Sequence, residues 1–366
     1  CFLCKLSQGI NKKRAAGGEN GFELTNSHFY LRIDKNTGAI SSLKYKKIKH
    51  DLVDRRKGLG LNDYFYVSGR KPDEPQRNGS VRIRIKEQGP LVNSLLIEAE
   101  APGCRSLLRE VRLIEGLDRV DIIDTIDKKK IIKPEGVHIA FPFDIPGGVI
   151  RIDAAWGIFR PELDQLPGSC KNYFSIQRWV DISNRDYGVT LTAVDAPLIE
   201  IGTITTDAIA AGWLEHIEPS QTLYSYVMNN YWETNYKASQ EGITVFRYAL
   251  KPHREFDPTE AKRFGIEQNQ PLIAVPVDHD SPPLPALFGI EPAAVILTSL
   301  KPSRDGKGML LRLFNTGETP AHVKIKWAKL QPQVYYHSSP FGESGRKIEK
   351  PFVIPASGIV TLRVEL

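Results

Sequence analysis

Residues 224–253, YSYVMNNYWETNYKASQEGITVFRYALKPH, decide the fold because two alternating runs flank a polar, aromatic segment. Apolar and polar side chains alternate over 223–228 and again over 243–250, and a period of two is typical of β-strands that bury one face. The segment between the runs, NNYWETNYKASQ, is rich in side chains suited to hydrogen bonding and stacking. It contains no obvious catalytic base.

The same alternation extends through much of the chain. Residues 29–47 form two alternating runs around Asp34–Gly38, where Asn and Gly supply the backbone freedom that a hairpin turn needs. From Val81 onward, alternating runs follow one another with Gly, Pro or Asp at the breaks, and few windows have a helical period. This pattern predicts an all-β sandwich over residues 22–256.

Four aspartates, Asp118, Asp121, Asp124 and Asp127, recur at every third residue of one such run. That spacing puts neighbours on opposite faces of a strand, so they are poorly placed to converge on a metal ion. We interpret them as solvent-facing residues of an amphipathic sheet.

The chain changes character after His253. Asp257 suits a helix cap, Pro258 suits the first turn, and the following residues predict a helix. A proline-rich segment follows, and the Asp-His-Asp triplet around His279 fits a surface loop better than a metal site. We expect a helix and linker over 257–290. The β pattern returns over 291–366, either as a small second sandwich or as a completion of the first.

The composition is that of an ordinary globular protein. The chain has 366 residues, of which 41% are hydrophobic and 25% charged, so a sizeable core is expected. Its net charge of +6 comes from 49 basic and 43 acidic residues. The local basic runs lack an aromatic-interleaved RNA motif or zinc-finger spacing, so nucleic acid is not an expected partner. No run approaches the ~18 apolar residues of a membrane span.

Four cysteines, Cys1, Cys4, Cys104 and Cys170, are too few for a disulfide framework in a chain of this length. Cys1 and Cys4 form a CxxC pair, but zinc would need two more ligands and none lies near in sequence. A first cysteine also suits a lipidated mature terminus. We favour a fragment of a longer protein, and we expect residues 1–21 to be a tail or linker.

No catalytic constellation is recognisable in the sequence. A GxSxG nucleophile elbow, a P-loop, a dinucleotide fingerprint and an HExxH zinc motif are all missing. His216 with Glu218 and His253 with Glu255 have His-x-Glu spacing, but each pair stands alone. We therefore expect no catalytic residue and no metal ligand in this chain.

Three stretches together point to a family. In 229–253, a Trp, a Thr-Asn pair and a Ser-Gln-x-Gly run precede a Phe-Arg-Tyr strand and a Pro-His end. The other two are FYLRIDKNTGAISSLKYKK (29–47) and SLKPSRDGKGMLLRLFNTGETPAHVKI (299–325). In combination they resemble the C-terminal β-region of family 38 glycoside hydrolases, the α-mannosidases. The resemblance extends over residues 22–366.

This resemblance implies a large β-supersandwich of the galactose-mutarotase-like type, a smaller C-terminal β-sandwich and little helix. Family members are retaining α-mannosidases whose zinc ion and aspartate nucleophile belong to an N-terminal barrel. No cofactor is therefore expected in this chain, and zinc only in the missing catalytic domain. In some members a tyrosine and an arginine of the β-region reach the active-site rim. Tyr66 is the plausible counterpart of the tyrosine, whereas VDAPLIEIG (194–202) offers no arginine.

Three functions remain open. The resemblance implies a β-region that packs on its own N-terminal catalytic domain, shapes the site for an α-mannoside or related glycan, and is inactive alone. A free-standing carbohydrate-binding domain is the second, in which Tyr231, Trp232 and Tyr236 stack on sugar rings while neighbouring asparagines bind hydroxyls. A mutarotase-like epimerase using a His and a carboxylate as acid and base is the third, and no such pair stands out. The compartment is not indicated: the parent protein is either cytoplasmic or exported.

The candidate carbohydrate-binding or barrel-facing residues come from three places. Strand residues around Tyr66 form the first, and loop 157–179 is the second, since binding groups gather on loops held by a rigid sheet. The loop's charged groups would equally serve to solvate it. The third is the 224–253 stretch, where a packed corner or a contact with the barrel is favoured over direct sugar contact. The full set is Tyr66, Arg160, Gln165, Arg178, Asn229, Asn230, Trp232, Thr234, Asn235, Tyr236 and Gln240.

Overall fold

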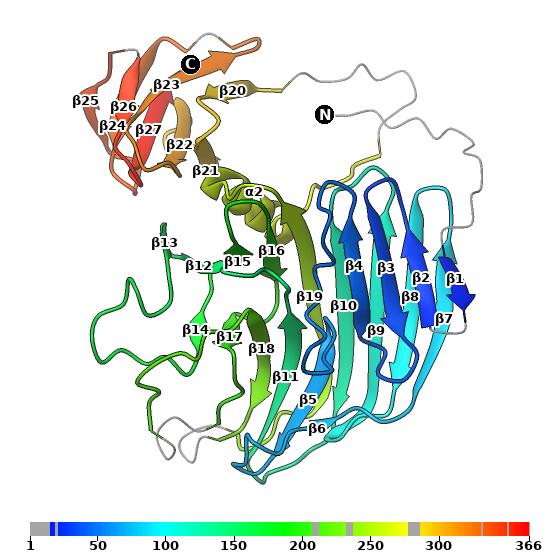
Figure 1. The fold of residues 1–366 in the computed structure, drawn as a ribbon. Helices are drawn as coiled ribbons and strands as arrows, with labels where there is room; N and C mark the ends of the chain where they lie inside the picture. The colour runs from blue at the N-terminus through cyan, green and yellow to red at the C-terminus, as the bar shows by residue number, and fades with distance from the viewer. Residues whose placement is uncertain are drawn as a thin grey trace. The chain divides into compact units, whose positions relative to one another are not determined.

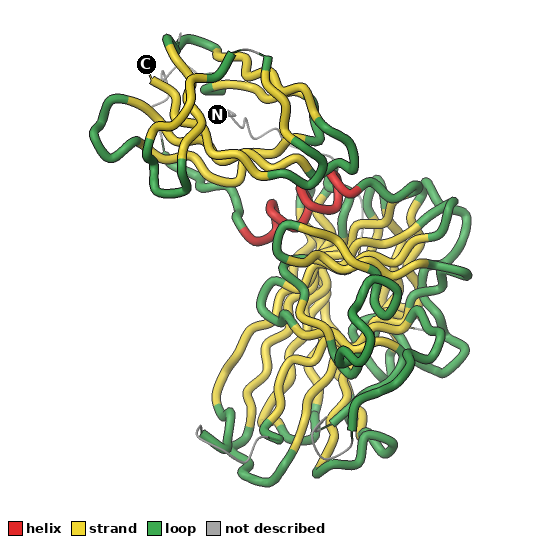
Figure 2. Tube along the Cα trace, turned by 90° about the vertical axis from the view of Figure 1, so that its left-hand side faces the viewer, coloured by secondary structure: helices red, strands yellow, loops and turns green. Residues whose placement is uncertain are grey.

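The computed structural model describes residues 15–18, 21–206, 212–231, 237–276, 286–330, 332–349 and 351–365. Within them the chain forms two compact units. The larger lies within Gly9–Ala154 and Ile158–Phe256, and the smaller includes Ala155–Gly157 and Asp257–Leu366. Strands dominate both units (Figures 1 and 2), as the alternating sequence predicts.

The larger unit begins with a four-stranded antiparallel sheet of β1 (Ala15–Gly18), β2 (Gly21–Thr25), β3 (Phe29–Asp34) and β4 (Ile40–Tyr45). The predicted hairpin is confirmed as β3 and β4. Its turn is closed by Asp34, whose Oδ1 accepts the backbone N–H groups of Asn36 and Thr37 at 2.9 and 3.0 Å. Gly38 takes the left-handed conformation there, with φ of 69°. Strand β1 lies in the stretch predicted to be a tail or linker.

Two further sheets make the large sandwich. The nine-stranded sheet contains, in spatial order, β13 (Gly157–Phe159), β12 (Val149–Ala154), β15 (Trp179–Ser183), β16 (Gly188–Ala193), β19 (Gly242–His253), β10 (Val120–Lys128), β9 (Cys104–Ile114), β8 (Val92–Ala99) and β7 (Val81–Gln88). The six-stranded sheet contains β14 (Phe174–Ser175), β17 (Leu198–Ile201), β18 (Thr222–Asn229), β11 (Glu135–Pro142), β5 (Asp63–Ser68) and β6 (Gln76–Arg77).

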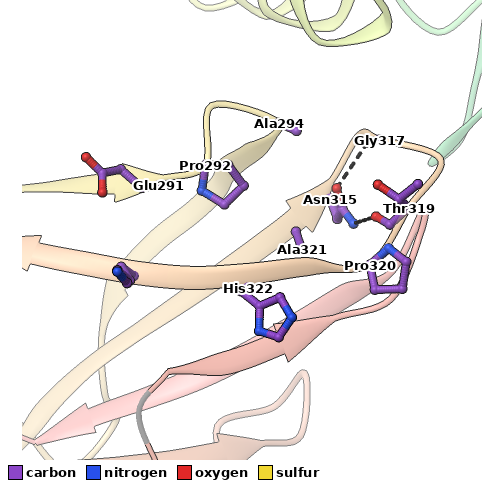
Figure 3. A pocket seen from close by; sticks show the side chains of 10 residues that line it. Glu291, Pro292, Ala294, Asn315, Gly317, Thr319, Pro320, Ala321 and His322 are labelled. Carbon is purple, nitrogen blue, oxygen red and sulfur yellow. Dashed lines mark hydrogen bonds between the residues drawn. The ribbon is translucent and has the colours of Figure 1, made fainter.

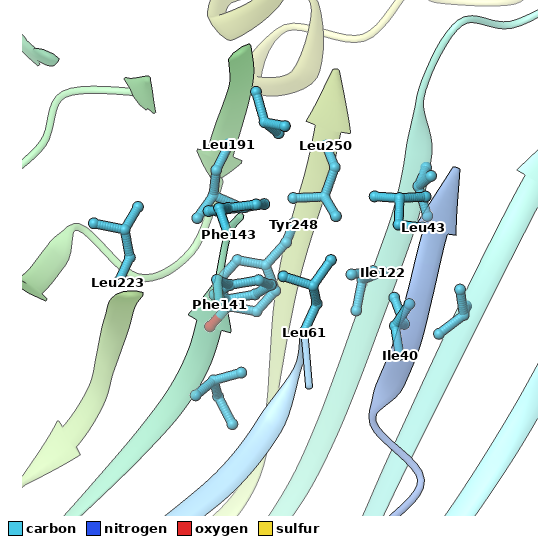
Figure 4. Packing of buried hydrophobic residues seen from close by; sticks show 14 of the residues in the cluster. Ile40, Leu43, Leu61, Ile122, Phe141, Phe143, Leu191, Leu223, Tyr248 and Leu250 are labelled. Carbon is cyan, nitrogen blue, oxygen red and sulfur yellow. The ribbon is translucent and has the colours of Figure 1, made fainter. Parts of the chain in front are cut away.

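These two sheets and the four-stranded sheet share one hydrophobic core, to which β4 contributes Ile40 and Leu43 (Figure 4). Phe141 of β11 and Tyr248 of β19 meet across it with ring centroids 5.1 Å apart. Leu223, Ile122 and Leu250 are also fully buried in this cluster. The alternating runs therefore bury one face each, and the predicted all-β supersandwich is confirmed.

The two runs of the opening stretch are both strands, β18 and β19. They do not pair with each other, because β18 joins the six-stranded sheet and β19 the nine-stranded one. Across the core, the Tyr248 hydroxyl donates to Ser225 Oγ at 3.0 Å. The two strands therefore belong to different sheets of the sandwich.

The prediction that all four aspartates face solvent is wrong for Asp124. Along β10 the even-numbered residues 120–128 are buried, so Asp124 points into the core and is fully buried. Asn62 donates to its Oδ1 at 2.9 Å. Asp121 and Asp127 have the opposite parity and form ion pairs with Arg119 and Arg105. Because successive side chains of a strand point to opposite faces, residues three apart also point to opposite faces, and every second aspartate along β10 points inward.

The smaller unit begins with helix α2 (Pro258–Asn269), the predicted helix, whose cap Asp257 accepts the Thr259 backbone N–H at 2.7 Å. No helix among the described residues is long and apolar enough to cross a membrane. One sheet contains β20 (Phe288–Glu291), β23 (Ala321–Trp327) and β26 (Phe352–Ile354). The other contains β21 (Val295–Pro302), β22 (Gly308–Asn315), β27 (Ile359–Glu365), β24 (Val334–Ser338) and β25 (Ser344–Lys347). They enclose a core of their own around Leu311, Ile354 and Leu362, so the smaller C-terminal sandwich is confirmed.

Candidate functional site

A buried polar cluster lies at one end of the six-stranded sheet, on the face toward the core. Tyr66 of β5 donates its hydroxyl to Glu135 Oε2 at 2.7 Å, and Lys128 Nζ of β10 donates to Glu135 Oε1 at 2.6 Å. The ammonium also donates to the Lys129 carbonyl at 3.1 Å and lies 6.0 Å from the centre of the Tyr66 ring. We call Tyr66, Lys128 and Glu135 the core-face cluster. Both oxygens of its carboxylate have donors.

Burial raises the pKa of Tyr66, and its hydrogen bond to Glu135 raises it further. The phenol therefore stays neutral and acts as a donor at physiological pH. Tyr66 is 7% exposed and packs in the main core. The residue predicted to reach an active-site rim is thus committed to an internal hydrogen bond.

Asn230 braces the same end of the sheet. Its Oδ1 accepts the Glu135 backbone N–H at 2.6 Å. Its Nδ2 donates to the carbonyls of Ile131, Lys133 and Ala238 at 3.1, 3.0 and 3.0 Å. Every polar atom of this amide is used inside the protein, so Asn230 fixes the chain rather than presenting an amide to a ligand.

A second cluster lies on the opposite side of the same sheet, the outer face, where Phe65, Ala140 and Tyr224 form a small cluster separate from the main core. His138 of β11 and Glu200 of β17 are fully buried, and the ring Nδ1 lies 2.6 Å from Glu200 Oε2. The other carboxylate oxygen accepts both the backbone N–H and the hydroxyl of Thr205 at 2.7 Å. Three hydrogen bonds therefore converge on this carboxylate.

The chemistry of Glu200 fixes the histidine tautomer. A carboxylate that accepts three hydrogen bonds needs a proton on the His138 Nδ1 that faces it. In the neutral ring Nε2 is then an acceptor. Tyr226 stacks on the imidazole with centroids 4.4 Å apart and planes at 17°, which holds the ring orientation. We call His138, Glu200 and Tyr231 the outer-face cluster.

Tyr231 follows β18 and lies over Gly136 of β11. It is 4% exposed, and Arg70 donates to its backbone carbonyl at 3.2 Å. Burial raises the pKa of its phenol, with the negative charge of Glu200 as the next cause. Its hydroxyl and His138 Nε2 are both buried without a hydrogen-bond partner among the described residues. The outer-face cluster thus has two open polar atoms, and the core-face cluster has none.

Arg160 and Gln165, two further predicted residues, make their contacts within their own loop. Arg160 forms a two-point ion pair with Asp164 at 2.9 and 2.7 Å, and Asp164 has its pKa lowered to about 2 by hydrogen bonds from Arg160. Gln165 accepts from the Glu162 backbone N–H at 2.8 Å and donates to the Cys170 carbonyl at 3.2 Å. These contacts brace the loop internally, although Arg160 also lines a pocket of about 270 Å³.

Among the other candidates, Asn229 is half-buried at the end of β18, Arg178 is half-buried, and Gln240 is exposed. Trp232, Thr234, Asn235 and Tyr236 lie outside the described residues.

The smaller unit has a groove of its own, of about 710 Å³ (Figure 3). Asn315 at its base donates to the Thr319 carbonyl at 2.8 Å and accepts the Gly317 N–H at 3.1 Å, so its amide shapes the loop. Glu291 and Lys324 supply charge along its sides, and His322 supplies an imidazole. Within the described ranges, no three His, Cys, Asp or Glu side chains converge as metal ligands.

Comparison with known proteins identifies the family. The model of the glycosyl hydrolases family 38 C-terminal domain matches residues 24–195. The model of the glycosyl hydrolases family 38 C-terminal beta sandwich domain matches residues 294–361. The chain belongs to the C-terminal region of glycosyl hydrolase family 38. The predicted resemblance is confirmed.

Solved structures of family 38 have the same fold. A family 38 protein from Enterococcus faecalis matches with a TM-score of 0.74 at 14% identity, covering 99% of this chain and 45% of that one. An alpha-mannosidase from Enterococcus faecalis V583 matches with a TM-score of 0.76 at 14% identity, covering 99% and 43%. This family 38 region therefore spans less than half the length of these relatives. No curated protein sequence matches it.

Of the outer-face cluster of this family 38 region, sequence reasoning named Tyr231 but missed His138 and Glu200. His138 and Glu200 lie 62 residues apart in the sequence. They meet because β11 and β17 lie on either side of the same strand, β18, in the sheet. The sequence signal was a His inside the apolar run HIAFPF, which resembles any other strand. The pair fulfils part of the epimerase hypothesis, because a His does face a carboxylate. His138 Nδ1 and Glu200 Oε2 are bonded to each other, so the two groups are not free to act together as acid and base.

Proposed function

We propose that this chain is the non-catalytic β-region of an α-mannosidase-like glycoside hydrolase. In this proposal it packs on a catalytic domain of the same protein and shapes the site for an α-mannoside or related glycan. The supporting observation is its alignment over nearly its whole length with less than half of two family 38 structures. The chemistry then belongs to the part of the protein outside this alignment.

Among the described residues, no three His, Cys, Asp or Glu side chains converge as metal ligands. Two of the deeply buried acids, Glu135 and Glu200, have hydrogen-bond partners on both carboxylate oxygens. Neither is available as a glycosidase nucleophile or general acid. In the proposal, zinc and the nucleophile are supplied by the catalytic domain.

The outer face of the six-stranded sheet is the part that we assign to glycan proximity. Aromatic rings gather there, with Phe65 and Tyr224 6.1 Å apart and Tyr226 stacked on His138. Aromatic surfaces with a few convergent polar atoms are typical of carbohydrate sites. This face is a better candidate than Tyr66, whose hydroxyl is used in the core.

Hydrolysis of an aryl α-mannoside tests the proposal. We expect no turnover by the isolated chain, with or without zinc, and turnover by the full product of the gene that encodes it. Turnover by the isolated chain would contradict the proposal, as would an inactive full product that binds no mannoside.

A free-standing carbohydrate-binding domain is the second candidate, and the two open polar atoms on the outer face favour it. Calorimetry of the isolated chain against methyl α-mannoside and mannobiose separates the two. Saturable binding without any catalytic domain supports the second candidate, and no detectable heat counts against it.

A further inference from the structure

The most informative feature outside the assigned roles is the pair of open atoms on the outer face. His138 Nε2 and the Tyr231 hydroxyl are both buried, and neither has a hydrogen-bond partner among the described residues. Burying a polar atom without a partner is unfavourable, so native proteins rarely leave two together. We propose that these atoms form a subsite for one hydroxyl group, whose oxygen accepts a hydrogen bond from Tyr231 and donates one to His138 Nε2.

Donor and acceptor types select a hydroxyl. His138 commits its Nδ1 proton to Glu200, so Nε2 is an acceptor. The Tyr231 phenol is held neutral by burial and by the nearby charges of Glu200 and Glu135, so it can donate. A carboxylate has no proton to give Nε2, and a carboxylate or phosphate would bring negative charge close to Glu200 and Glu135. An ammonium cannot accept from Tyr231. A hydroxyl or a water molecule does both.

Both open atoms lie over Gly136. A Cβ at Gly136 would lie 2.9 Å from His138 Nε2 and 2.9 Å from the Tyr231 hydroxyl oxygen. The two atoms are therefore separated by no more than twice that distance, which one oxygen spans with two ordinary hydrogen bonds. Gly136 lies within strand β11 and is not among the positive-φ glycines. Glycine is therefore needed at this position because a Cβ would collide with the two side chains, not because the backbone takes an unusual conformation.

The remaining partners hold the subsite rigid. Tyr226 stacks on the imidazole, and Thr205 binds the far oxygen of Glu200 twice. Arg70 fixes the backbone of Tyr231. A preorganised site of this kind binds its ligand without first ordering its own side chains.

Two sources could supply the hydroxyl: a tightly bound water molecule, or a sugar hydroxyl of the glycan in the proposed function. Nuclear magnetic resonance of the isolated chain with ¹⁵N-labelled histidine distinguishes them, with His138→Gln used for assignment. We expect the neutral Nδ1–H tautomer of His138 and a cross-peak from a hydroxyl proton to its ring. If a water molecule occupies the subsite, adding methyl α-mannoside leaves the His138 signal unchanged. If a sugar hydroxyl occupies it, methyl α-mannoside shifts the His138 signal until the site is saturated. Only this second outcome rests on the proposed function.

Three variants make the test specific. Gly136→Ala places a methyl group between the two atoms and should abolish the hydroxyl cross-peak. Tyr231→Phe removes one hydrogen-bonding atom without adding volume, and should do the same if the first variant fails to fold. Gly289→Ala, at another strand glycine with nothing within 4 Å of the new Cβ, should leave the signal intact.

Two results would overturn the subsite. One is His138 found as the Nε2–H tautomer or as imidazolium at neutral pH, which removes the acceptor. The other is a crystal structure in which Tyr231 donates directly to His138 with no third oxygen. Both are independent of mannoside turnover, so a failure of the proposed function would be recognised separately.

Discussion

The two faces of the six-stranded sheet have buried polar clusters of similar composition and different completeness. On the core face, both Glu135 oxygens are met by Tyr66 and Lys128. On the outer face, Glu200 is equally well met, but His138 Nε2 and the Tyr231 hydroxyl are left open. A complete network stabilises and fixes a fold, whereas open atoms of complementary type can recognise something else. The comparison assigns structure to one face and recognition to the other.

Removing the cation of the core-face cluster should have the largest effect. Lys128→Met keeps the apolar stem but leaves the Glu135 charge buried without its ammonium. Removing one partner of a buried ion pair costs about 3–5 kcal/mol of unfolding free energy. Urea unfolding of the variant and the parent chain measures this loss. The control is Arg160→Ala, which removes an exposed ion pair and should leave the free energy of unfolding unchanged. A similarly small loss of unfolding free energy in both variants would contradict the account.

Asp124 should make stability fall as pH rises. Burial raises its pKa from 3.8 to about 7 in the folded chain. The folded state therefore holds this proton more tightly than the unfolded state, and its contribution is full below pH 4 and lost by about pH 7. Linkage gives about 1.4 kcal/mol per pH unit at most, and the pKa difference spans about 3 pH units, so we expect a loss of roughly 4 kcal/mol relative to Asp124→Asn. Urea midpoints measured from pH 4 to pH 8 check this. Parallel curves for the two proteins would exclude it.

Removing the charge of the outer-face cluster should have a smaller effect. Glu200→Gln keeps the shape and an acceptor for Thr205, but weakens a charge-assisted hydrogen bond to His138. Such bonds contribute about 1.5–3 kcal/mol, and part of this should survive in the amide. The ¹⁵N spectrum should also lose its preference for the Nδ1–H tautomer. An unchanged tautomer would show that Glu200 does not set it.

Most of the fold could be predicted from the sequence, because burial of one face imposes a period of two. The strands, the Asp34–Gly38 hairpin and the Asp257 cap are all local patterns. Pairing is not local: nothing in the opening stretch shows that β18 and β19 belong to different sheets. Asp124 was misread because spacing alone does not say which parity faces the core.

The candidate site was harder to predict for the same reason. Aromatic and amide richness drew the prediction to 229–240, where Asn230 turns out to be a brace. His138 and Glu200 come from separate strands whose neighbourhood depends on sheet order. The open atoms lie over Gly136, and a glycine inside a strand gives no sign in the sequence that two side chains pack over it.

The most direct test compares two tyrosine-to-phenylalanine variants by urea unfolding. Tyr66→Phe removes a satisfied hydrogen bond and leaves Glu135 short of a donor, which should cost about 1–3 kcal/mol. Tyr231→Phe removes a hydroxyl with no protein partner and should cost less than about 0.5 kcal/mol. Equal losses in the two variants would contradict the division of the sheet into a structural face and a recognition face.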